Sequence, residues 1–343
     1  MTEFKASKLE NLIKVPQKIA KLVNLYVGDG DYSRRMFGEQ FAYGHREILL
    51  KYCGLDFSTQ IIGNLQHGVY GYKQKIDFRS PRFIGGKPST FWVYSKMYEE
   101  IGKSLDHNNV TAIGAPWLYL RKCISEEMKS ISTKNEILVM PSHSQSTYVS
   151  TSSAGEKRKR AKAFREVIGS QQATVCLYAM DICDPEVVEA YFDEGFRITC
   201  IGSSIHHPSW SQSGNRIRSL NKLMTLMKSH RTLVTDSYGS HLLYGITMGM
   251  EIGVFPEIRK LSKVEEMYGK RMEDYEEVKE LSNELEFFNR YMPESIDNVY
   301  GSTSYLPIAN EILGLESIME PAELRSVLDY RKGVYPISQI QPW

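Results

Sequence analysis

The chain has 343 residues, more than the ~100–200 of a typical single domain, and this length favours two domains. Its composition is 42% hydrophobic and 24% charged, which is typical of a globular protein and excludes the disordered and fibrous classes. The formal net charge is +1, so the whole chain lacks the electrostatic footprint of a nucleic-acid-binding protein.

The five cysteines have no Cys-x-x-Cys spacing. An odd set of this kind argues against a disulfide framework and a zinc site, and favours a reducing compartment. The N-terminal residues lack the apolar segment of a signal peptide, and no run approaches the ~18 apolar residues of a membrane span. We therefore expect a cytoplasmic protein that is soluble or at most peripheral to a membrane.

Residues 1 to about 56 are expected to be helical, because their apolar residues recur at helical spacing. After them, short apolar runs alternate with helical stretches. Most of these runs lack strict alternation and are flanked by Gly, Pro or Ser, as strands buried on both faces of a parallel sheet are. The predicted strands cover residues 60–65, 90–95, 110–115, 136–142, 174–180, 197–203, 232–237 and 251–256.

The alternation of strands and helices predicts an α/β fold with parallel sheets. A polar segment near residues 125–135 separates two series of strands, and we place the domain boundary there. Two Rossmann-like lobes are expected to face each other across a cleft. Residues 1–130 would form an N-terminal lobe with a helical extension, and residues 131–343 a C-terminal lobe with terminal helices. Ligands of such sheets bind at the carboxyl ends of the strands.

Small polar residues and histidines follow three of the predicted strands. In "NLQHG", His67 stands between Gln66 and Gly68. It could be a catalytic group, a phosphate contact or a turn residue. In "VMPSHSQS", His143 and Ser144 belong to a cluster of hydroxyl and imidazole groups that suits an anion.

The third such stretch is "VTDSYGSHLLYG", with Asp236 at the strand end and Gly239, Ser240 and His241 where a helix should begin. A helix N-terminus offers unpaired N–H groups and a partial positive charge to a phosphate. Ser240 and His241 would add donors of their own. The alternative is a serine that only caps a buried helix.

Other motifs carry weaker signals. "CIGSSIHHPSW" places Ser203 and Ser204 after a strand as further phosphate contacts, whereas its adjacent histidines have no third metal ligand at a recognised spacing. "VGDGDY" pairs Asp29 with Asp31 before the first strand, which favours a polar turn. The basic run at 156–165 predicts a solvated helix face, with contact to anionic lipid or an acidic glycan as the alternative. Dinucleotide, P-loop and α/β-hydrolase fingerprints are missing from the sequence.

Four stretches together resemble the two-lobed (GT-B) glycosyltransferases of bacterial capsule and lipopolysaccharide assembly: "GHREILLKYCGLD…IIGNLQHG", "FWVYSKMYEEIG…VTAIGAPWLYL", "ILVMPSHS" and "LVTDSYGSHLLYGITMG". They are most similar to the branch with polysialyltransferase-like and CDP-glycerol glycerophosphotransferase-like enzymes, over residues 40–255. The resemblance implies that Gly239, Ser240 and His241 hold the phosphate of a donor nucleotide, with His143 and Ser144 beside them. It also implies transfer without a metal or another cofactor.

The resemblance places His67 at the reacting centre, with Gln66 and Gly68 on the acceptor side. A histidine with a pKa near ~6.5 suits proton removal at neutral pH. His45 is a second candidate for this base, and a carboxylate such as Asp31 is a third. His67 could still be only a turn residue whose ring bonds to the backbone.

The expected function is glycosyl transfer from a nucleotide sugar, with a CMP-linked acidic sugar favoured on family likeness, to a glycan or lipid-linked glycan acceptor. Peripheral association with the inner membrane or with capsule-assembly proteins would follow from such an acceptor. The alternatives are a polyol-phosphate transferase, a nucleotide-sugar epimerase and a non-catalytic capsule-assembly scaffold. In the scaffold, the charged segment at 263–290 would bind a partner.

Overall fold

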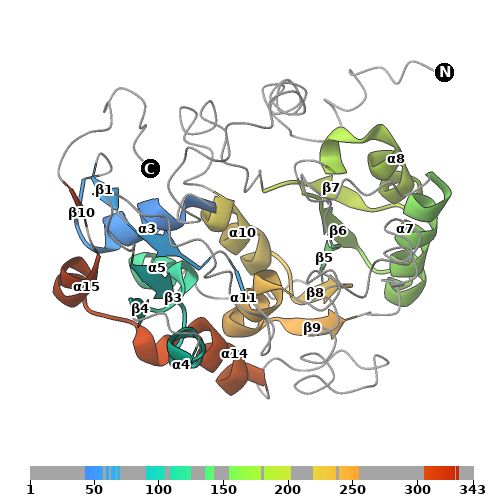
Figure 1. The fold of residues 1–343 in the computed structure, drawn as a ribbon. Helices are drawn as coiled ribbons and strands as arrows, with labels where there is room; N and C mark the ends of the chain where they lie inside the picture. Colours follow the sequence, from blue (N-terminus) through green and yellow to red (C-terminus); the bar gives the residue numbers. More distant parts are fainter. Residues whose placement is uncertain are drawn as a thin grey trace, which may run out of the picture.

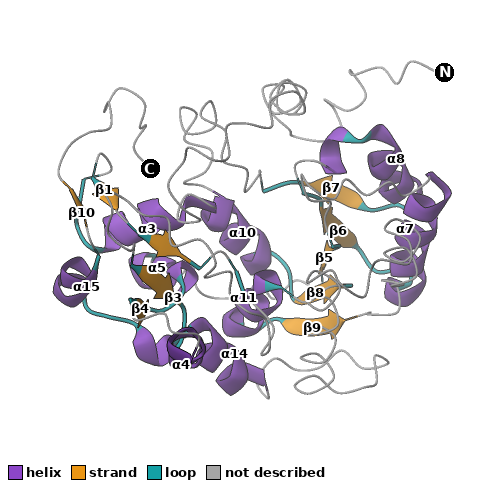
Figure 2. Ribbon diagram, in the orientation of Figure 1, coloured by secondary structure: helices purple, strands orange, loops and turns teal. Residues whose placement is uncertain are grey.

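The computed structural model describes thirteen parts of the chain, and everything said below of the structure concerns these parts. They are residues 43–56, 59–61, 63–66, 68–69, 90–104, 109–124, 136–142, 154–178, 181–201, 219–236, 239–254, 305–328 and 330–331. Figure 1 shows their helices and strands in chain order, and Figure 2 separates helices from strands by colour. No helix in these parts is long and apolar enough to cross a membrane.

The first parallel sheet has the strand order β2-β3-β4, with β2 at Asn64–Leu65, β3 at Phe91–Val93 and β4 at Val110–Ala112. Its helices are α3 (His45–Tyr52), α4 (Lys96–Ser104) and α5 (Pro116–Cys123). Proline opens α5 at a position where its missing N–H costs no helical bond. The Glu99 carboxylate fastens α4 to β4, because its Oε2 accepts a hydrogen bond from the Ala112 N–H at 3.0 Å.

The second sheet has five parallel strands in the order β7-β6-β5-β8-β9. Counted along the chain from β5, this is the order 3-2-1-4-5 of a doubly wound Rossmann-type sheet. The strands are β5 (Ile137–Met140), β6 (Ala173–Cys176), β7 (Arg197–Thr199), β8 (Thr232–Thr235) and β9 (Glu251–Val254). The order reverses between β5 and β8, which pair with Val139 opposite Val234.

Helices cover both faces of the second sheet (Figures 1 and 2). On one face α7 (Ala154–Ile168) and α8 (Pro185–Asp193) bury Val139 and Val234. On the other, α10 (Ser219–Lys228) and α11 (Ser240–Met248) bury Leu138 and Leu233. Successive strand residues point to opposite faces, so a run without alternation is apolar because both faces are covered. A short 3-10 helix, η3 (Asp181–Cys183), precedes α8.

The two parallel sheets share a continuous apolar core through α10 and α11. The Trp117 ring on α5 stacks on the Tyr244 ring on α11, with centroids 4.3 Å apart and planes 12° from parallel. The Trp117 indole N–H donates to Thr247 Oγ1 at 3.0 Å. Direct packing of α5 on α11 therefore connects the first sheet to the helix that follows β8.

The C-terminal segment returns to the first sheet. It contains α14 (Leu306–Leu313), η7 (Leu315–Ser317), α15 (Pro321–Val327) and β10 (Tyr330–Arg331), which pairs antiparallel with β1 (Gln60–Ile61). The Ala115 N–H donates to the Leu313 carbonyl at 2.8 Å, while α14 also packs on α11. The expected domain division assigns residues 305–331 to the second lobe and stays a prediction. In the structure these residues contact both α11 and the segment that follows β4.

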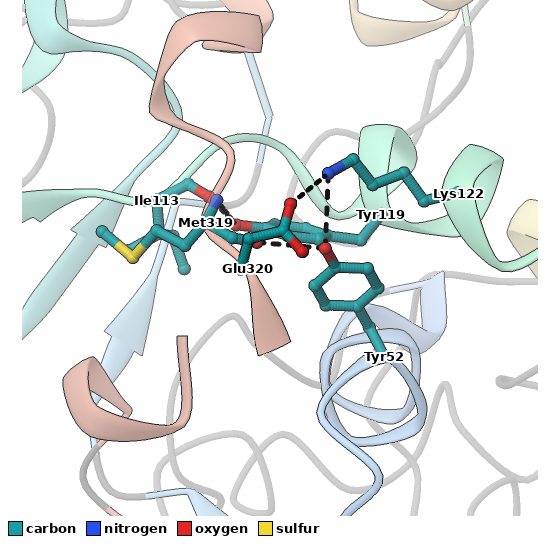
Figure 3. Close-up of polar contacts among 6 residues, drawn as sticks. All are labelled: Tyr52, Ile113, Tyr119, Lys122, Met319 and Glu320. Carbon is teal, nitrogen blue, oxygen red and sulfur yellow. Dashed lines mark hydrogen bonds and ion pairs between the residues drawn. The ribbon is translucent and has the colours of Figure 1, made fainter. Parts of the chain in front are cut away.

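Figure 3 shows how the segment between η7 and α15 is held against α3 and α5. The Met319 N–H donates to the Tyr119 hydroxyl at 3.1 Å, and the Met319 carbonyl accepts from the Tyr52 hydroxyl at 3.1 Å. The Tyr119 hydroxyl in turn donates to the Ile113 carbonyl. Lys122 adds an exposed ion pair with Glu320 at 3.3 Å. Backbone groups of a connecting segment are thus satisfied by tyrosines of the first sheet's helices.

The predicted α/β class with parallel sheets is confirmed, and each of the eight predicted strands overlaps a strand of the structure. The first, at 60–65, contains two short ones, β1 and β2. The antiparallel pair β1-β10 was not predicted, because its partners are separated by most of the chain. The proposed boundary at 125–135 and the helices expected before residue 43 lie outside the described residues. The cleft between the lobes stays a prediction.

Candidate functional site

The site lies where the order of the five-stranded sheet reverses. Parallel sheets of this type bind ligands outside the carboxyl ends of their strands at such a switch point. Here β5 continues into Pro141 and Ser142, and β8 continues into Asp236. The two strand ends are joined directly, because the Ser142 N–H donates to Asp236 Oδ1 at 2.6 Å.

Helix α11 begins beside this point. Gly239 is its N-cap residue, and no side chain caps its first N–H groups. These groups and the helix dipole favour an anion at the N-terminus. Gly245 lets the helix approach the sheet closely, because a Cβ atom there would lie 2.8 Å from Leu233 Cδ2 and 3.2 Å from Ile252 Cδ1. The close packing fixes the direction in which the helix N-terminus points.

A loop from the first sheet contacts the start of α11. The Val69 N–H donates to Ser240 Oγ at 3.2 Å, and a Cβ atom at Gly68 would be 3.4 Å from the same oxygen. Gln66, which is 4% exposed, holds the loop from the other side. Its Oε1 accepts from the Tyr94 N–H at 2.9 Å, and its Nε2 donates to the Gly68 carbonyl at 2.6 Å.

His67 itself lies outside the described residues, but its neighbours on both sides belong to this loop. The structure therefore brings together the predicted acceptor-side residues Gln66 and Gly68 and the predicted phosphate contact Ser240. Nothing in their sequence spacing shows this meeting, since Val69 and Ser240 are 171 residues apart. The buried Gln66 amide supports the loop from inside the protein, because both its oxygen and its nitrogen are hydrogen-bonded to backbone groups.

The side chains of Ser240 and His241 rest on buried neighbours. His241 Nε2 lies 3.0 Å from Thr235 Oγ1, which links the first turn of α11 back to the end of β8. Burial raises the pKa of Tyr244 well above its usual range, although the nearby hydroxyls of Ser240 and Tyr94 oppose that rise. Tyr244 thus stays a neutral hydroxyl beneath Ser240 and provides a fixed polar support.

Asp236 has partners that the sequence did not indicate. Its carboxylate is 1% exposed and forms an ion pair with Arg160 of α7, whose Nε donates to Oδ2 at 2.7 Å. A second donor of Arg160 reaches Ser142 Oγ. A buried carboxylate would repel a phosphate, and this one is already satisfied. We therefore reassign Asp236 from a predicted phosphate contact to a residue that holds the two strand ends.

Arg160 belongs to the basic run at 156–165, and other cations of that run also have partners within the protein. Lys157 pairs with Asp184 at 2.6 Å and with Glu186 at 3.0 Å. Arg165 donates to the Glu194 carbonyl at 2.7 Å and lies over the Phe196 ring. These cations stabilise the packing of α7, whereas Arg158 and Lys159 are exposed, in keeping with the predicted solvated face. Contact with lipid or glycan stays a prediction.

His45 is the first residue of α3 and is only 1% exposed. Its ring lies 6.0 Å from the Tyr43 ring. A base must touch the hydroxyl that it deprotonates, so this burial argues against the catalytic role predicted for His45. The remaining predicted residues lie outside the described parts of the chain, and their roles stay predictions: Asp31, His67, His143, Ser144, Ser203 and Ser204.

Among the described residues no group of three or more His, Cys, Asp or Glu side chains could hold a metal ion. The adjacent histidines of "SSIHHPSW" are not described, so transfer without a metal stays a prediction.

Comparison with known proteins gives only distant similarities. No family model and no curated protein matches this chain. Among solved structures, the chain is similar to the wall teichoic acid polymerase TagF, with 13% identity, a TM-score of 0.34, and coverage of 78% of this chain and 69% of that one.

Two further structures are the MnaA–UDP co-structure from S. aureus and the UDP-GlcNAc 2-epimerase from Neisseria meningitidis bound to UDP-GlcNAc. The first has 14% identity and a TM-score of 0.36, and covers 78% of this chain and 70% of that one. The second has 12% identity and a TM-score of 0.31, and the similarity covers 77% of this chain and 67% of that one. These similarities are low, and the α/β assignment rests on the strand order and pairing of this chain itself.

Proposed function

We propose that this chain is a GT-B-type glycosyltransferase that moves a sugar from a nucleotide-sugar donor to a hydroxyl of a bacterial surface polysaccharide or lipopolysaccharide. One observation carries the proposal: the Val69 N–H of the first-sheet loop donates to Ser240 Oγ at the start of α11. Acceptor-side and donor-side elements would have to meet at such a point. Its position at the switch point of a doubly wound sheet supports a nucleotide ligand.

Glycosyl transfer needs a base for the acceptor proton and donors for the leaving phosphate. The acceptor oxygen bonds to the anomeric carbon, and the bond from that carbon to the phosphate oxygen breaks, with its electrons leaving on the nucleotide. The first N–H groups of α11, the Ser240 hydroxyl and the His241 ring are the proposed phosphate donors. His67 is the proposed base, with Asp31 as the carboxylate alternative. No metal or other cofactor takes part in this proposal.

The donor site is tested by thermal unfolding with CMP, CDP, UDP, GDP and inorganic phosphate. A ligand at 100 times its Kd stabilises the folded state by about 2.7 kcal/mol, so a bound nucleotide raises the melting temperature measurably. We expect one nucleotide to stabilise the protein more than phosphate does, with CMP or CDP favoured. Equal effects of all nucleotides and of phosphate would refute the donor site.

The role of Ser240 is tested with Ser240→Ala. A hydrogen bond to a charged group is worth about 1.5–3 kcal/mol, so the Kd of that nucleotide should rise about 10- to 100-fold. Ser229→Ala is the matched control, because Ser229 is exposed directly after α10 and its hydroxyl contacts only nearby groups, the Leu226 carbonyl and His230 Nδ1. If both variants bind equally well, Ser240 is not a phosphate contact.

The transferred group is identified by mass spectrometry of the product. A sugar added to the acceptor supports the proposal, whereas an added polyol phosphate would make the chain a polyol-phosphate transferase. Conversion of the nucleotide sugar without any acceptor would indicate an epimerase. If no nucleotide sugar is consumed, the scaffold alternative gains support. Recovery of the protein with inner-membrane vesicles that carry the acceptor would support peripheral association there.

A further inference from the structure

The Arg160–Asp236 pair links three structural elements at the switch point. Asp236 directly follows β8, Ser142 lies two residues after the end of β5, and Arg160 belongs to α7. One carboxylate serves both neighbours, since Oδ1 accepts from the Ser142 N–H and Oδ2 from Arg160. The backbone pairing of β5 with β8 ends at Met140 and Thr235, and beyond it this carboxylate joins the two strand ends.

The Arg160–Asp236 pair differs from a surface ion pair in its burial. The Asp236 side chain is 1% exposed and that of Arg160 is 29% exposed. Removing such a carboxylate from water is costly unless charge and hydrogen bonds compensate for it. By contrast, Arg197 of β7 pairs with Glu136 at 2.8 Å at the amino ends of the strands of the same sheet, with 57% of its side chain exposed.

We propose that Arg160 and Asp236 are positioning residues that hold Ser142, after β5, in a fixed place relative to Asp236, after β8, and so preorganise the phosphate site at the start of α11. This inference rests on the proposed function, and it deepens it by naming the residues that hold the donor site in shape. Arg160 acts through Ser142 and Asp236 and does not touch the substrate. A phosphate clamp built from two loops loses affinity when their spacing relaxes.

The informative substitution is Asp236→Asn. Asparagine has one acceptor oxygen, so it can accept from the Ser142 N–H or from Arg160, but its NH₂ group then faces the other donor. In either case one of the two hydrogen bonds that join the strand ends is lost. Arg160→Lys is the milder second variant, because it keeps the charge and loses the fork that reaches Asp236 and Ser142 together. Arg197→Met is the control, because it removes an exposed ion pair of the same sheet at the amino ends of its strands.

Two measurements are made on the full chain, well below the melting temperature of each variant. The first is amide hydrogen exchange, for which we expect faster exchange at Ser142 and at Gly239 and Ser240, with little change elsewhere. The second is the Kd for CDP and UDP, for which we expect a rise of about 10-fold or more. A uniform increase in exchange with an unchanged Kd would mean that the pair only stabilises the fold, and would overturn the proposal.

The two proposals fail in different ways. If the wild-type chain binds neither CDP nor UDP, the proposed donor site is wrong for these nucleotides, and the exchange data alone then decide whether the pair holds both loops. If the wild type binds and both variants bind as tightly, the positioning role is wrong and the donor site stands. Loss of folding in Asp236→Asn leaves Arg160→Lys to give the result. Arg197→Met should match the wild type in both measurements.

Discussion

Glu99 offers a quantitative test of how the first sheet is held together. Glu99 is 8% exposed. Its carboxylate accepts hydrogen bonds from Lys96 at 2.9 Å, from Lys103 at 2.5 Å and from the Ala112 N–H at 3.0 Å. Burial by itself would raise the pKa of Glu99, but these bonds and the Lys96 charge outweigh it. The pKa falls from its ordinary 4.5 to about 2.

A pKa displaced from 4.5 to about 2 corresponds to about 3 kcal/mol of stability for the ionised form. Lys96 and Lys103 are 58% and 55% exposed, and solvent screening reduces this figure to about 1–2 kcal/mol. Because the pKa is lower in the folded state, the contribution is complete above about pH 4.5. It is lost as the pH falls towards about 2.

The assay is urea denaturation of the wild type and of Glu99→Gln between pH 7 and pH 3. We expect the variant to lose about 1–2 kcal/mol at pH 7 and to converge on the wild type as the pH falls. Glu100→Gln is the control, because Glu100 is the next residue of α4 and is exposed. An equal loss at pH 7 and pH 3, or the same loss in the control, would refute the reasoning.

Three further predictions concern close packing and the site. Gly245→Ala should cost about 1–3 kcal/mol of unfolding free energy in chemical denaturation, since its Cβ would meet Leu233 Cδ2 at 2.8 Å; wild-type stability would contradict this. Gly314→Ala should cost more than about 2 kcal/mol, because its φ is 72° and its Cβ would clash with the Tyr94 carbonyl; Gly54→Ala, with φ of 64° and open space, should lose only about 1 kcal/mol in the same assay. Gln66→Leu leaves the buried Tyr94 N–H without its acceptor and should cost about 1–3 kcal/mol while weakening catalysis through the loop; unchanged turnover would argue against that loop's role.

The apolar runs predicted the strands well because each run reports local burial. Residues 232–235, for instance, form a strand whose four side chains are all buried, as a central parallel strand requires. The start of α11 was also predictable, since glycine and serine precede an apolar helical stretch at that point. These signals lie within a few residues of the feature that they predict.

The predicted site was only partly accessible to the same reasoning. Ser240 was recognised as a helix-start residue, but its contact with Val69 depends on how the two sheets pack. Arg160 was interpreted as one of several solvated cations, although it reaches a carboxylate 76 residues away. His45 had a plausible residue type in a helix, and only its burial argued against a catalytic role.

The sequence by itself determined the α/β class, the strands and the positions of the strand-end residues, because periodicity and capping are local properties of the chain. The tertiary structure decided the strand order β7-β6-β5-β8-β9, the pairing of β10 with β1 and the partners of Asp236. An apolar pattern shows which face of an element is buried but not which element covers it. The long-range packing that answers this question also brings the loop at 66–69 to the start of α11.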